Sequence, residues 1–365
     1  MPEPQSFGRF FLPGPTEVLP EILHAQSGPM VGHRAKAMED LIAEVQPGLQ
    51  AIFRTERPVY ISTSSSTGLM EGAVRNGAVR RVLSLVNGAF SERFYRIAES
   101  TGLHAEALAV EWGQVNTPEA LVDALRVGDF DAVTVVHSET STGVLNPIRE
   151  LAQACHQAGD VVLLVDSVSG AGGTKLETDA WELDVALTGS QKAFALPPGL
   201  AFAVANERIL LRAERKKDRG IYFDFLEFEK NIRKNQTPNT PAVSLFYALA
   251  AQMRRIQAEG VEARWARHTA MAEATYRWVD HMRGRGYPLS VLAPEGFRSP
   301  TVTCITLPDG VSGSDVNRRV KERGFTIATG YGKLKESTIR IGHMGDHTVA
   351  ETEAVLSVVE EVLSR

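Results

Sequence analysis

The first part of the chain alternates short apolar runs with longer segments in which apolar residues recur every three or four positions. Short β-branched apolar runs are typical of buried strands, and the longer spacing is typical of helices. The predicted strands are 59–61, 82–86, 105–110, 132–137, 161–165, 185–188 and 201–205, and helices at 67–76, 90–100, 118–125 and 148–158 separate several of them. This alternation predicts an α/β fold with a mostly parallel seven-stranded sheet flanked by helices.

The pattern changes after a long helical stretch at 244–283. Strands at 301–306, 325–328 and 338–342, with helices at 313–323 and 347–363, predict a smaller carboxyl-terminal α+β unit. Three prolines, Pro13, Pro15 and Pro20, predict an extended arm at the amino end. We therefore divide the chain into an arm (1–20), a large domain (21–260) and a small domain (261–365).

The composition narrows the class of protein. A chain of 365 residues with 43% hydrophobic and 23% charged residues predicts about two globular units. The net charge of −5 argues against nucleic acid as a partner. No apolar run reaches the roughly 20 residues of a membrane span, and the first residues do not resemble a secretion signal, so we expect a cytoplasmic protein with no membrane partner. The two cysteines and scattered histidines predict neither disulfide nor metal site.

A carboxylate and an amine follow two of the predicted strands. Asp166 closes the apolar run 161–165, and Lys192 comes shortly after the run 185–188. Parallel strands end at one edge of the sheet, where ligand crevices form. The pair suits pyridoxal phosphate, because the lysine can form an imine with the cofactor aldehyde and the carboxylate can keep the pyridine nitrogen protonated. A single lysine after a strand is more often an exposed charge, so the interpretation depends on the surrounding motifs.

Two hydroxyl-rich segments also follow strands. Segment 62–68 carries Ser65, Ser66 and Thr67 at the start of a predicted helix, where hydroxyl and N–H donors suit a phosphate, although they can also be ordinary helix caps. Segment 137–143 places Thr140 where it, together with Gln191, can donate to the phenolic oxygen of the cofactor; turn formation is the alternative.

Three further residues are candidates for the same site. Phe90 follows a strand and can cover one face of a flat ring, with Val168 on the other face, although apolar residues at such positions often belong to the core. Arg340 lies within an apolar strand pattern, where a guanidinium suits a bidentate contact to a substrate carboxylate. An edge-strand arginine that faces solvent is the alternative for Arg340.

Seven separated motifs then agree in order with one family. They are Pro13-Gly-Pro-Thr16, Gly32-His-Arg34, Ser65-Ser-Thr-Gly68, Glu139-Thr-Ser-Thr-Gly143, Val165-Asp-Ser-Val168, Gly189-Ser-Gln-Lys192 with Pro197-Pro-Gly199, and Arg340-Ile-Gly342. The sequence resembles the class V, fold type I aminotransferases that use pyridoxal phosphate. Within them it is most similar to the alanine:glyoxylate and serine:pyruvate or serine:glyoxylate group, over residues 9 to 362.

The resemblance implies a role for each motif. Lys192 would be the imine lysine and proton carrier, and Asp166 would pair with the pyridine nitrogen. Phosphate contacts would come from Ser65, Ser66 and Thr67, and from Thr237 and Thr240 of a neighbouring subunit, which implies a homodimer with shared active sites. Arg340 would clamp the substrate carboxylate, and Gly14 of the arm would line the same pocket. Relatives often have tryptophan at the position of Phe90, and some have histidine and tyrosine at those of Thr67 and Thr237.

The implied activity is transfer of an amino group from alanine or serine to glyoxylate or pyruvate. Other class V transaminases, acting on aspartate, 2-aminoethylphosphonate or ureidoglycine, stay open. A cysteine desulfurase needs a nucleophilic cysteine in the loop at 328–333, which contains none. A nonenzymatic binder of the cofactor would not need Arg340, and a Rossmann-like nucleotide binder would need a Gly-x-Gly-x-x-Gly motif that is not found after the first strand. Donor, acceptor, pathway and assembly beyond the dimer stay undecided.

Overall fold

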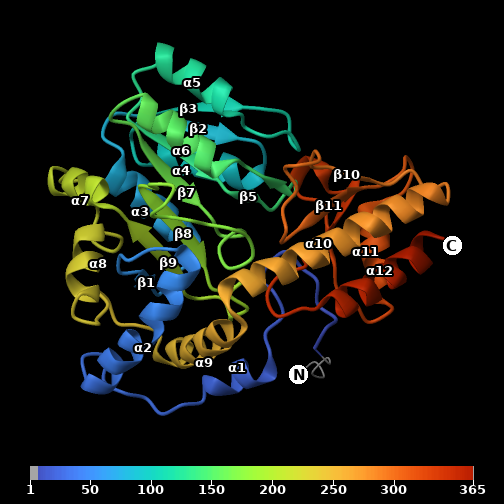
Figure 1. Ribbon diagram of the computed structural model, residues 1–365, viewed down its shortest axis with the longest axis horizontal. Helices are drawn as coiled ribbons and strands as arrows, with labels where there is room; N and C mark the ends of the chain where they lie inside the picture. Colours follow the sequence, from blue (N-terminus) through green and yellow to red (C-terminus); the bar gives the residue numbers. More distant parts are fainter. Residues whose placement is uncertain (1–6, 365) are drawn as a thin grey trace.

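A seven-stranded sheet forms the centre of the larger part of the computed structural model, which describes residues 7–364 (Figure 1). Its strand order is β1-β9-β8-β7-β4-β2-β3. The strands are β1 (Tyr60–Ser62), β2 (Arg81–Val86), β3 (His104–Ala109), β4 (Ala132–Val136), β7 (Val162–Asp166), β8 (Val185–Gly189) and β9 (Ala201–Ala205). Only β9 runs antiparallel to its neighbours in this sheet. The predicted mostly parallel sheet is therefore confirmed.

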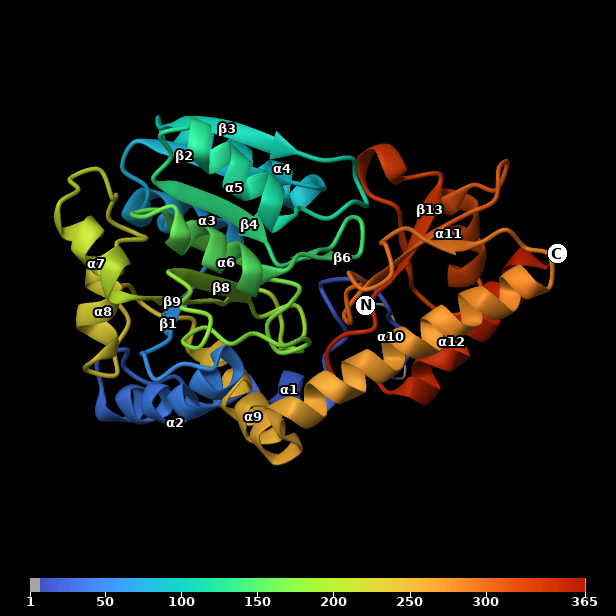
Figure 2. The same cartoon turned by 45° about the horizontal axis from the view of Figure 1, so that its top comes forward.

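Helices cover both faces of this sheet (Figure 2). They are α2 (Lys36–Phe53), α3 (Ser66–Gly77), α4 (Ala89–Ser100), α5 (Pro118–Val127), α6 (Ile148–Gln157), α7 (Glu207–Glu214) and α8 (Phe225–Ile232). The start of α5 follows from its sequence, because the Thr117 hydroxyl accepts from the Ala120 N–H and Pro118 occupies the first turn. By contrast, α4 follows Gly88, which has no side chain to cap it.

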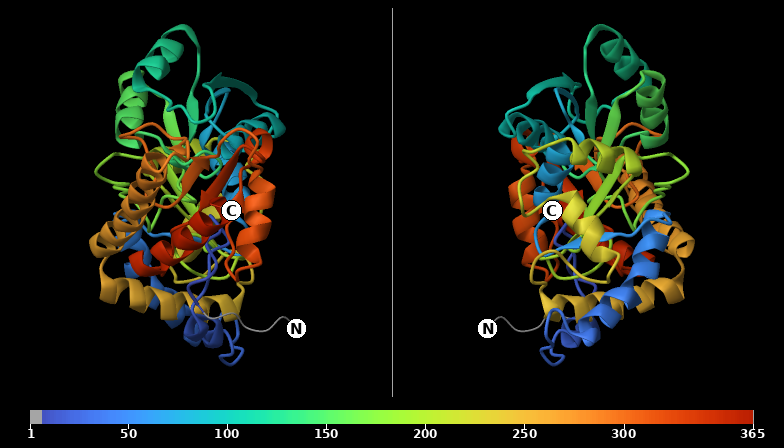
Figure 3. Two further views of the ribbon diagram at one scale, coloured as in Figure 1. Left: turned by 90° about the vertical axis from the view of Figure 1, so that its right-hand side faces the viewer. Right: turned by 90° about the vertical axis from the view of Figure 1, so that its left-hand side faces the viewer.

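A four-stranded antiparallel sheet forms the smaller part, in the order β10-β11-β13-β12. It consists of β10 (Ser290–Val291), β11 (Thr303–Thr306), β12 (Ala328–Thr329) and β13 (Thr338–Ile341), with helices α11 (Gly313–Lys321) and α12 (Val349–Leu363) and the short 3-10 helix η1 (Gly332–Leu334). Helices α10 (Val261–Gly284) and α12 pack along each other (Figure 3). A second apolar core lies between these helices and the small sheet.

The structure differs from the predicted pattern in some details. The helical stretch at 244–283 is two helices, α9 (Val243–Glu259) and α10, because Gly260 between them has a φ of 85° that ends the first helix. The strand expected at 325–328 is shifted to Ala328–Thr329, because Thr326 pairs with Phe10 of the amino-terminal segment instead. The short hairpin β5 (Ser138–Glu139) and β6 (Val144–Leu145) was not predicted.

The amino-terminal arm joins the two sheets. Residues 1–6 of the predicted arm lie outside the described residues, and α1 (Pro20–Ala25) begins where the arm ends. Phe11 is fully buried in the second core, donates through its N–H to the Thr326 carbonyl at 2.7 Å and accepts from the Gly342 N–H at 2.9 Å. Farther along the arm, the Thr16 N–H donates to the Gln191 carbonyl at 3.0 Å. The arm therefore connects the small sheet to the segment that carries Lys192.

The proposed boundaries between arm, large domain and small domain stay predictions. No helix within residues 7–364 combines the length and apolar character that a membrane crossing needs.

Candidate active site

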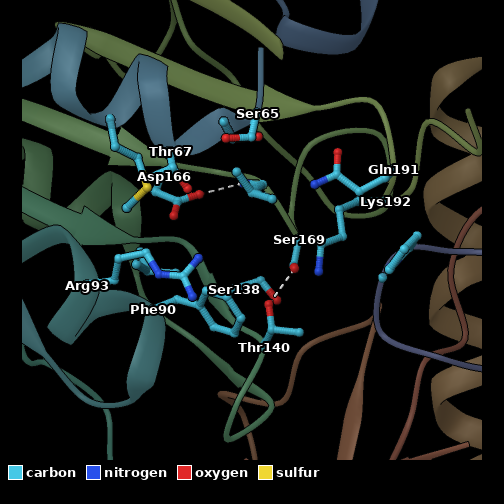
Figure 4. Close-up of a pocket in the computed structure, with 16 residues that line it drawn as sticks. Ser65, Thr67, Phe90, Arg93, Ser138, Thr140, Asp166, Ser169, Gln191 and Lys192 are labelled. Atoms are coloured by element: carbon cyan, nitrogen blue, oxygen red, sulfur yellow. Dashed lines mark hydrogen bonds between the residues drawn. The ribbon is translucent and has the colours of Figure 1, made fainter. Parts of the chain in front are cut away.

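A cavity of about 240 Å³ lies at the carboxyl edge of the large sheet, beside the amino-terminal arm (Figure 4). It brings together ten of the thirteen residues that the sequence predicts for the site: Gly14, Ser65, Ser66, Thr67, Phe90, Thr140, Asp166, Val168, Gln191 and Lys192. The sequence prediction missed Pro15, Met70, Arg93, Val136, Ser138 and Ser169, which also line it. Arg340, Thr237 and Thr240 lie outside its lining.

Asp166 ends β7 and is only 3% exposed. Its Oδ1 accepts a hydrogen bond from the Val168 N–H at 2.8 Å, and its Oδ2 has no hydrogen-bond partner within residues 7–364. Burial raises the pKa of Asp166 to about 7, against the lowering effect of the Val168 bond. Oδ2 is therefore available to a ligand group that carries a proton.

Lys192 lies in the turn that follows β8, the strand that pairs in parallel with β7. The side chain is buried, and its Nζ donates to the Pro13 carbonyl of the arm. Gly14 makes this approach possible, because a Cβ there would lie 2.4 Å from Nζ. Burial, and next the charge of Arg340, lower the pKa of Lys192 to about 8. The neutral, nucleophilic form of this amine is therefore much more populated near physiological pH than that of an ordinary lysine.

The amino end of α3 provides donors for an anion. Ser65 occupies the cap position, and the Ser66 Oγ is buried with no hydrogen-bond partner in the described chain. Gly189 of β8 leaves room for this hydroxyl, since a Cβ at that position would lie 2.3 Å from the Ser66 Oγ. The first turn of α3 has no acidic residue. An unpaired hydroxyl at a helix amino end is suited to a phosphate group.

Thr140 lies on the opposite side of the cavity from this helix end (Figure 4). Its Oγ1 is 2.5 Å from the Oγ of Ser169, a residue that the sequence did not predict for the site. Ser169 lies three residues after Asp166, so its proximity to the end of β7 was the available signal. Gln191 precedes Lys192 and lines the same cavity.

Arg340 lies at the border of the cavity. β13 is flanked by β11 and β12, and Arg340 is 7% exposed, so it is not the solvent-facing edge residue of the alternative interpretation. The Arg340 Nη1 donates to the Thr140 carbonyl at 3.1 Å, and Nε donates to the Thr329 carbonyl at 2.9 Å. Its guanidinium centre is 5.5 Å from the Tyr331 ring centroid. The contact with Thr140 connects the small sheet to the cavity wall.

Thr237 and Thr240 are not brought to the cavity of their own chain. They lie beside the end of β1, where the Thr237 Oγ1 donates to the Asn239 carbonyl at 2.7 Å. Arg34 fixes this segment, since its guanidinium donates to the Thr237 and Pro238 carbonyls at 2.7 and 3.2 Å. The structure therefore does not place these threonines against the cavity of their own chain.

The residues around the cavity fit pyridoxal phosphate. The unpaired Ser66 hydroxyl at the end of α3 suits the phosphate, and the unpaired Oδ2 of Asp166 suits a protonated ring nitrogen. The buried amine of Lys192 suits the aldehyde carbon. These three groups come from different segments of one sheet edge, so their meeting is a property of the fold.

Comparisons with known proteins agree with this chemistry. The family model described as aminotransferase class-V matches residues 31–351. An uncharacterized aminotransferase of Methanocaldococcus jannaschii is 37% identical, over 96% of this chain and 91% of its own length. The serine–glyoxylate aminotransferase of Methylorubrum extorquens is 32% identical, over 92% of this chain and 86% of its own. The structure of alanine–glyoxylate aminotransferase from Nostoc sp. has a TM-score of 0.92, with 28% identity over 100% of this chain and 97% of that one.

The lowered pKa of Lys192 predicts how the reactivity of its amine depends on pH. Its lowered pKa means that the neutral amine accumulates as the pH rises through about 8, well below the ordinary value of 10.5. In cofactor-free protein, the rate of Lys192 acetylation by limiting acetic anhydride should reach half its maximum near pH 8. Peptide mass spectrometry measures this rate, with exposed Lys335 of the same digest as reference. A midpoint near 10.5 would show that the amine is solvated.

Proposed function

Since the chain belongs to the class-V aminotransferases, we propose that it transfers the amino group of alanine or serine to glyoxylate or pyruvate. The enzyme is a pyridoxal phosphate-dependent aminotransferase, and its substrates are small amino and 2-oxo acids. The observation that supports the site is the meeting of the Lys192 amine and the Asp166 carboxylate in one cavity. The preference for small donors is inferred from the relatives that act on serine and alanine.

Pyridoxal phosphate, when bound, supplies an electron-accepting ring that stabilises negative charge at the α-carbon of an amino acid. The phosphate-binding residues would be Ser65, Ser66 and Thr67, whose hydroxyls and N–H groups start α3. Asp166 Oδ2 would hold a proton on the ring nitrogen, and Thr140 with Gln191 would bind the phenolic oxygen. The ring would lie between Phe90 and Val168.

Lys192 would take the proton from the α-carbon of the donor at its Nζ. Burial favours the neutral amine, which is the form that accepts a proton. The nearby Arg340 contributes to the same lowering of the pKa, and it would bind the α-carboxylate of the donor. Gly14 and Pro13 of the arm exclude water from one side of the amine. The guanidinium of Arg340 would thus orient the substrate while the amine of Lys192 moves the proton.

A homodimer would complete the site. Thr237 and Thr240 lie outside the cavity of their own chain, and the Ser66 hydroxyl has no partner in that chain. We assign the two threonines to the phosphate site of the neighbouring subunit, as the family resemblance implies. The cytoplasmic location likewise stays a prediction.

Aspartate is the second candidate donor, and one observation favours it. Arg93 lines the cavity, and its guanidinium makes no ion pair within the described residues, although it lies 4.9 Å from the Phe90 ring centroid. Such a cation can pair with a second carboxylate. A desulfurase is disfavoured, because Cys304 is fully buried in β11 and burial raises its pKa to about 11.

A panel of donors tests the proposal. We expect alanine and serine to give the highest kcat/KM with glyoxylate or pyruvate, measured by product 2-oxo acid, with aspartate and 2-aminoethylphosphonate assayed beside them. Lys192→Ala should remove both turnover and the visible absorbance of the bound cofactor, because no other amine lines the cavity among residues 7–364. Higher kcat/KM for aspartate would replace the small-donor proposal with the second candidate.

Loss of the Arg340 guanidinium should impair turnover of the amino donor more than it impairs binding of the cofactor. Arg340→Ala should lower kcat/KM for alanine about 100-fold, since a charge-assisted contact is removed, while the Kd for pyridoxal phosphate stays within about threefold. Arg298→Ala is the matched control, because Arg298 also stacks on a tyrosine and donates to a carbonyl, outside the cavity lining. Equal losses of donor and cofactor binding would contradict the assignment.

A site shared between two subunits predicts the mass of the protein in solution and the effect of a substitution on cofactor binding. Sedimentation should give twice the chain mass of 39.8 kDa. Thr240→Ala should raise the Kd for pyridoxal phosphate several-fold without changing that mass, because it removes a hydroxyl from the phosphate site of the other subunit. A wild-type protein that sediments as a monomer and still binds pyridoxal phosphate would exclude a shared site.

A further inference from the structure

Glu139 belongs to the motif at 139–143, of which the proposed function uses only Thr140. The carboxylate is fully buried, at 0% exposure, and it does not line the cavity. We propose that Glu139 is a positioning residue that fixes the amino end of α4, and with it Phe90, against the Thr140 turn. This inference rests on the proposed function to the extent that Phe90 and Thr140 contact the cofactor.

The two oxygens of Glu139 together accept hydrogen bonds from two segments, the start of α4 and the turn at 139–141. Oε2 accepts from the N–H and the hydroxyl of Ser91, each at 2.9 Å. Oε1 accepts from the Phe90 N–H at 3.3 Å and from the N–H and hydroxyl of Ser141 at 3.1 and 2.6 Å. Three of these donors are backbone N–H groups, which can donate but cannot accept a hydrogen bond. The position therefore requires two acceptor oxygens, which a carboxylate provides.

Helix α4 depends on this external carboxylate for its cap. The residue at its cap position is Gly88, so the first N–H groups need acceptors from elsewhere. The Ala89 N–H donates to the Ser141 hydroxyl at 3.0 Å, and the next two N–H groups donate to Glu139. A Cβ on Gly88 would lie 2.4 Å from the Glu139 Cγ, so glycine permits the close approach. The segment at 139–141 thus replaces the missing cap.

The same turn carries two other groups of the site. The Thr140 carbonyl accepts from Arg340, and the Thr140 hydroxyl contacts Ser169. The turn itself closes through the Gly143 N–H, which donates to the Glu139 carbonyl at 2.8 Å. A shift of Glu139 would therefore move Phe90 on one side and the Thr140–Arg340 contact on the other. We expect a single substitution to disturb both cofactor orientation and donor binding.

Glu139→Gln tests the proposal with little change in volume. One oxygen becomes an NH₂ group that faces N–H donors, so at least one N–H at the start of α4 loses its acceptor. In the full-length protein as purified, hydrogen exchange at residues 89–91 should become about tenfold faster. The Kd for pyridoxal phosphate should rise about tenfold, and the circular dichroism of the bound cofactor should decrease.

Asp131→Asn is the matched control. Asp131 is another buried carboxylate, 4% exposed, and it accepts from the Val79, Arg80 and Arg81 N–H groups at 2.7 to 2.9 Å. It precedes β4, so it lies at the sheet edge opposite the cavity. We expect Asp131→Asn to lower the thermal stability of the protein. The dichroism of the cofactor, its Kd and the hydrogen exchange at 89–91 should stay unchanged. If Asp131→Asn also shows faster exchange at 89–91, a higher Kd and a weaker cofactor dichroism, Glu139 acts only as a general stabilising residue. That outcome would overturn the proposal.

Ser141→Ala provides a second variant if Glu139→Gln does not fold. It removes the acceptor of the Ala89 N–H and leaves the carboxylate, so exchange at residue 89 should accelerate with a smaller change in Kd. Unchanged exchange in this variant, or wild-type exchange and dichroism in Glu139→Gln, would overturn the proposal. Failure of the wild-type protein to bind pyridoxal phosphate would instead refute the proposed function, and the exchange measurement would still test Glu139.

Discussion

Burial of an amine and a carboxylate in one cavity is the constraint on which the site depends. Removing either group from water disfavours its charged form, so the pKa of Lys192 falls and that of Asp166 rises. Neither residue forms a direct ion pair with the other, and each keeps an atom available to the cavity. The protein thus holds two polar groups whose interactions are completed only by a ligand, an arrangement that is unfavourable unless the surrounding fold enforces it.

That enforcement comes from segments that are far apart in the sequence. The arm covers Lys192 from one side, and β13 brings Arg340 to the Thr140 carbonyl from the small sheet. The turn at 139–141 connects this contact to the amino end of α4. The cavity is lined by the arm and by segments of the large sheet, and Arg340 supports its wall from the small sheet through the Thr140 carbonyl.

The pattern of apolar residues and the order of the motifs along the chain were sufficient to predict the sheet and most of the residues that line the cavity. Each parallel strand has its own apolar run, and a residue that follows such a run must lie at the carboxyl edge, which is why Asp166, Lys192 and Thr140 were found. The pairing of Thr326 with Phe10 could not be predicted, because it depends on a tertiary contact with the arm. The role of Glu139 as an acceptor could not be predicted for a similar reason, because its partners lie on another segment. Ser169 could have been proposed from its place just after the end of β7, although its contact with Thr140 depends on the fold.

The arm is tethered on both sides of Pro13. Phe11 before it hydrogen-bonds to Thr326 and Gly342 beside the small sheet, and Thr16 after it donates to the Gln191 carbonyl next to the lysine. Pro13 itself accepts from the Nζ of Lys192. A displacement of the small sheet would therefore be transmitted along this tether to the carbonyl group that the amine contacts.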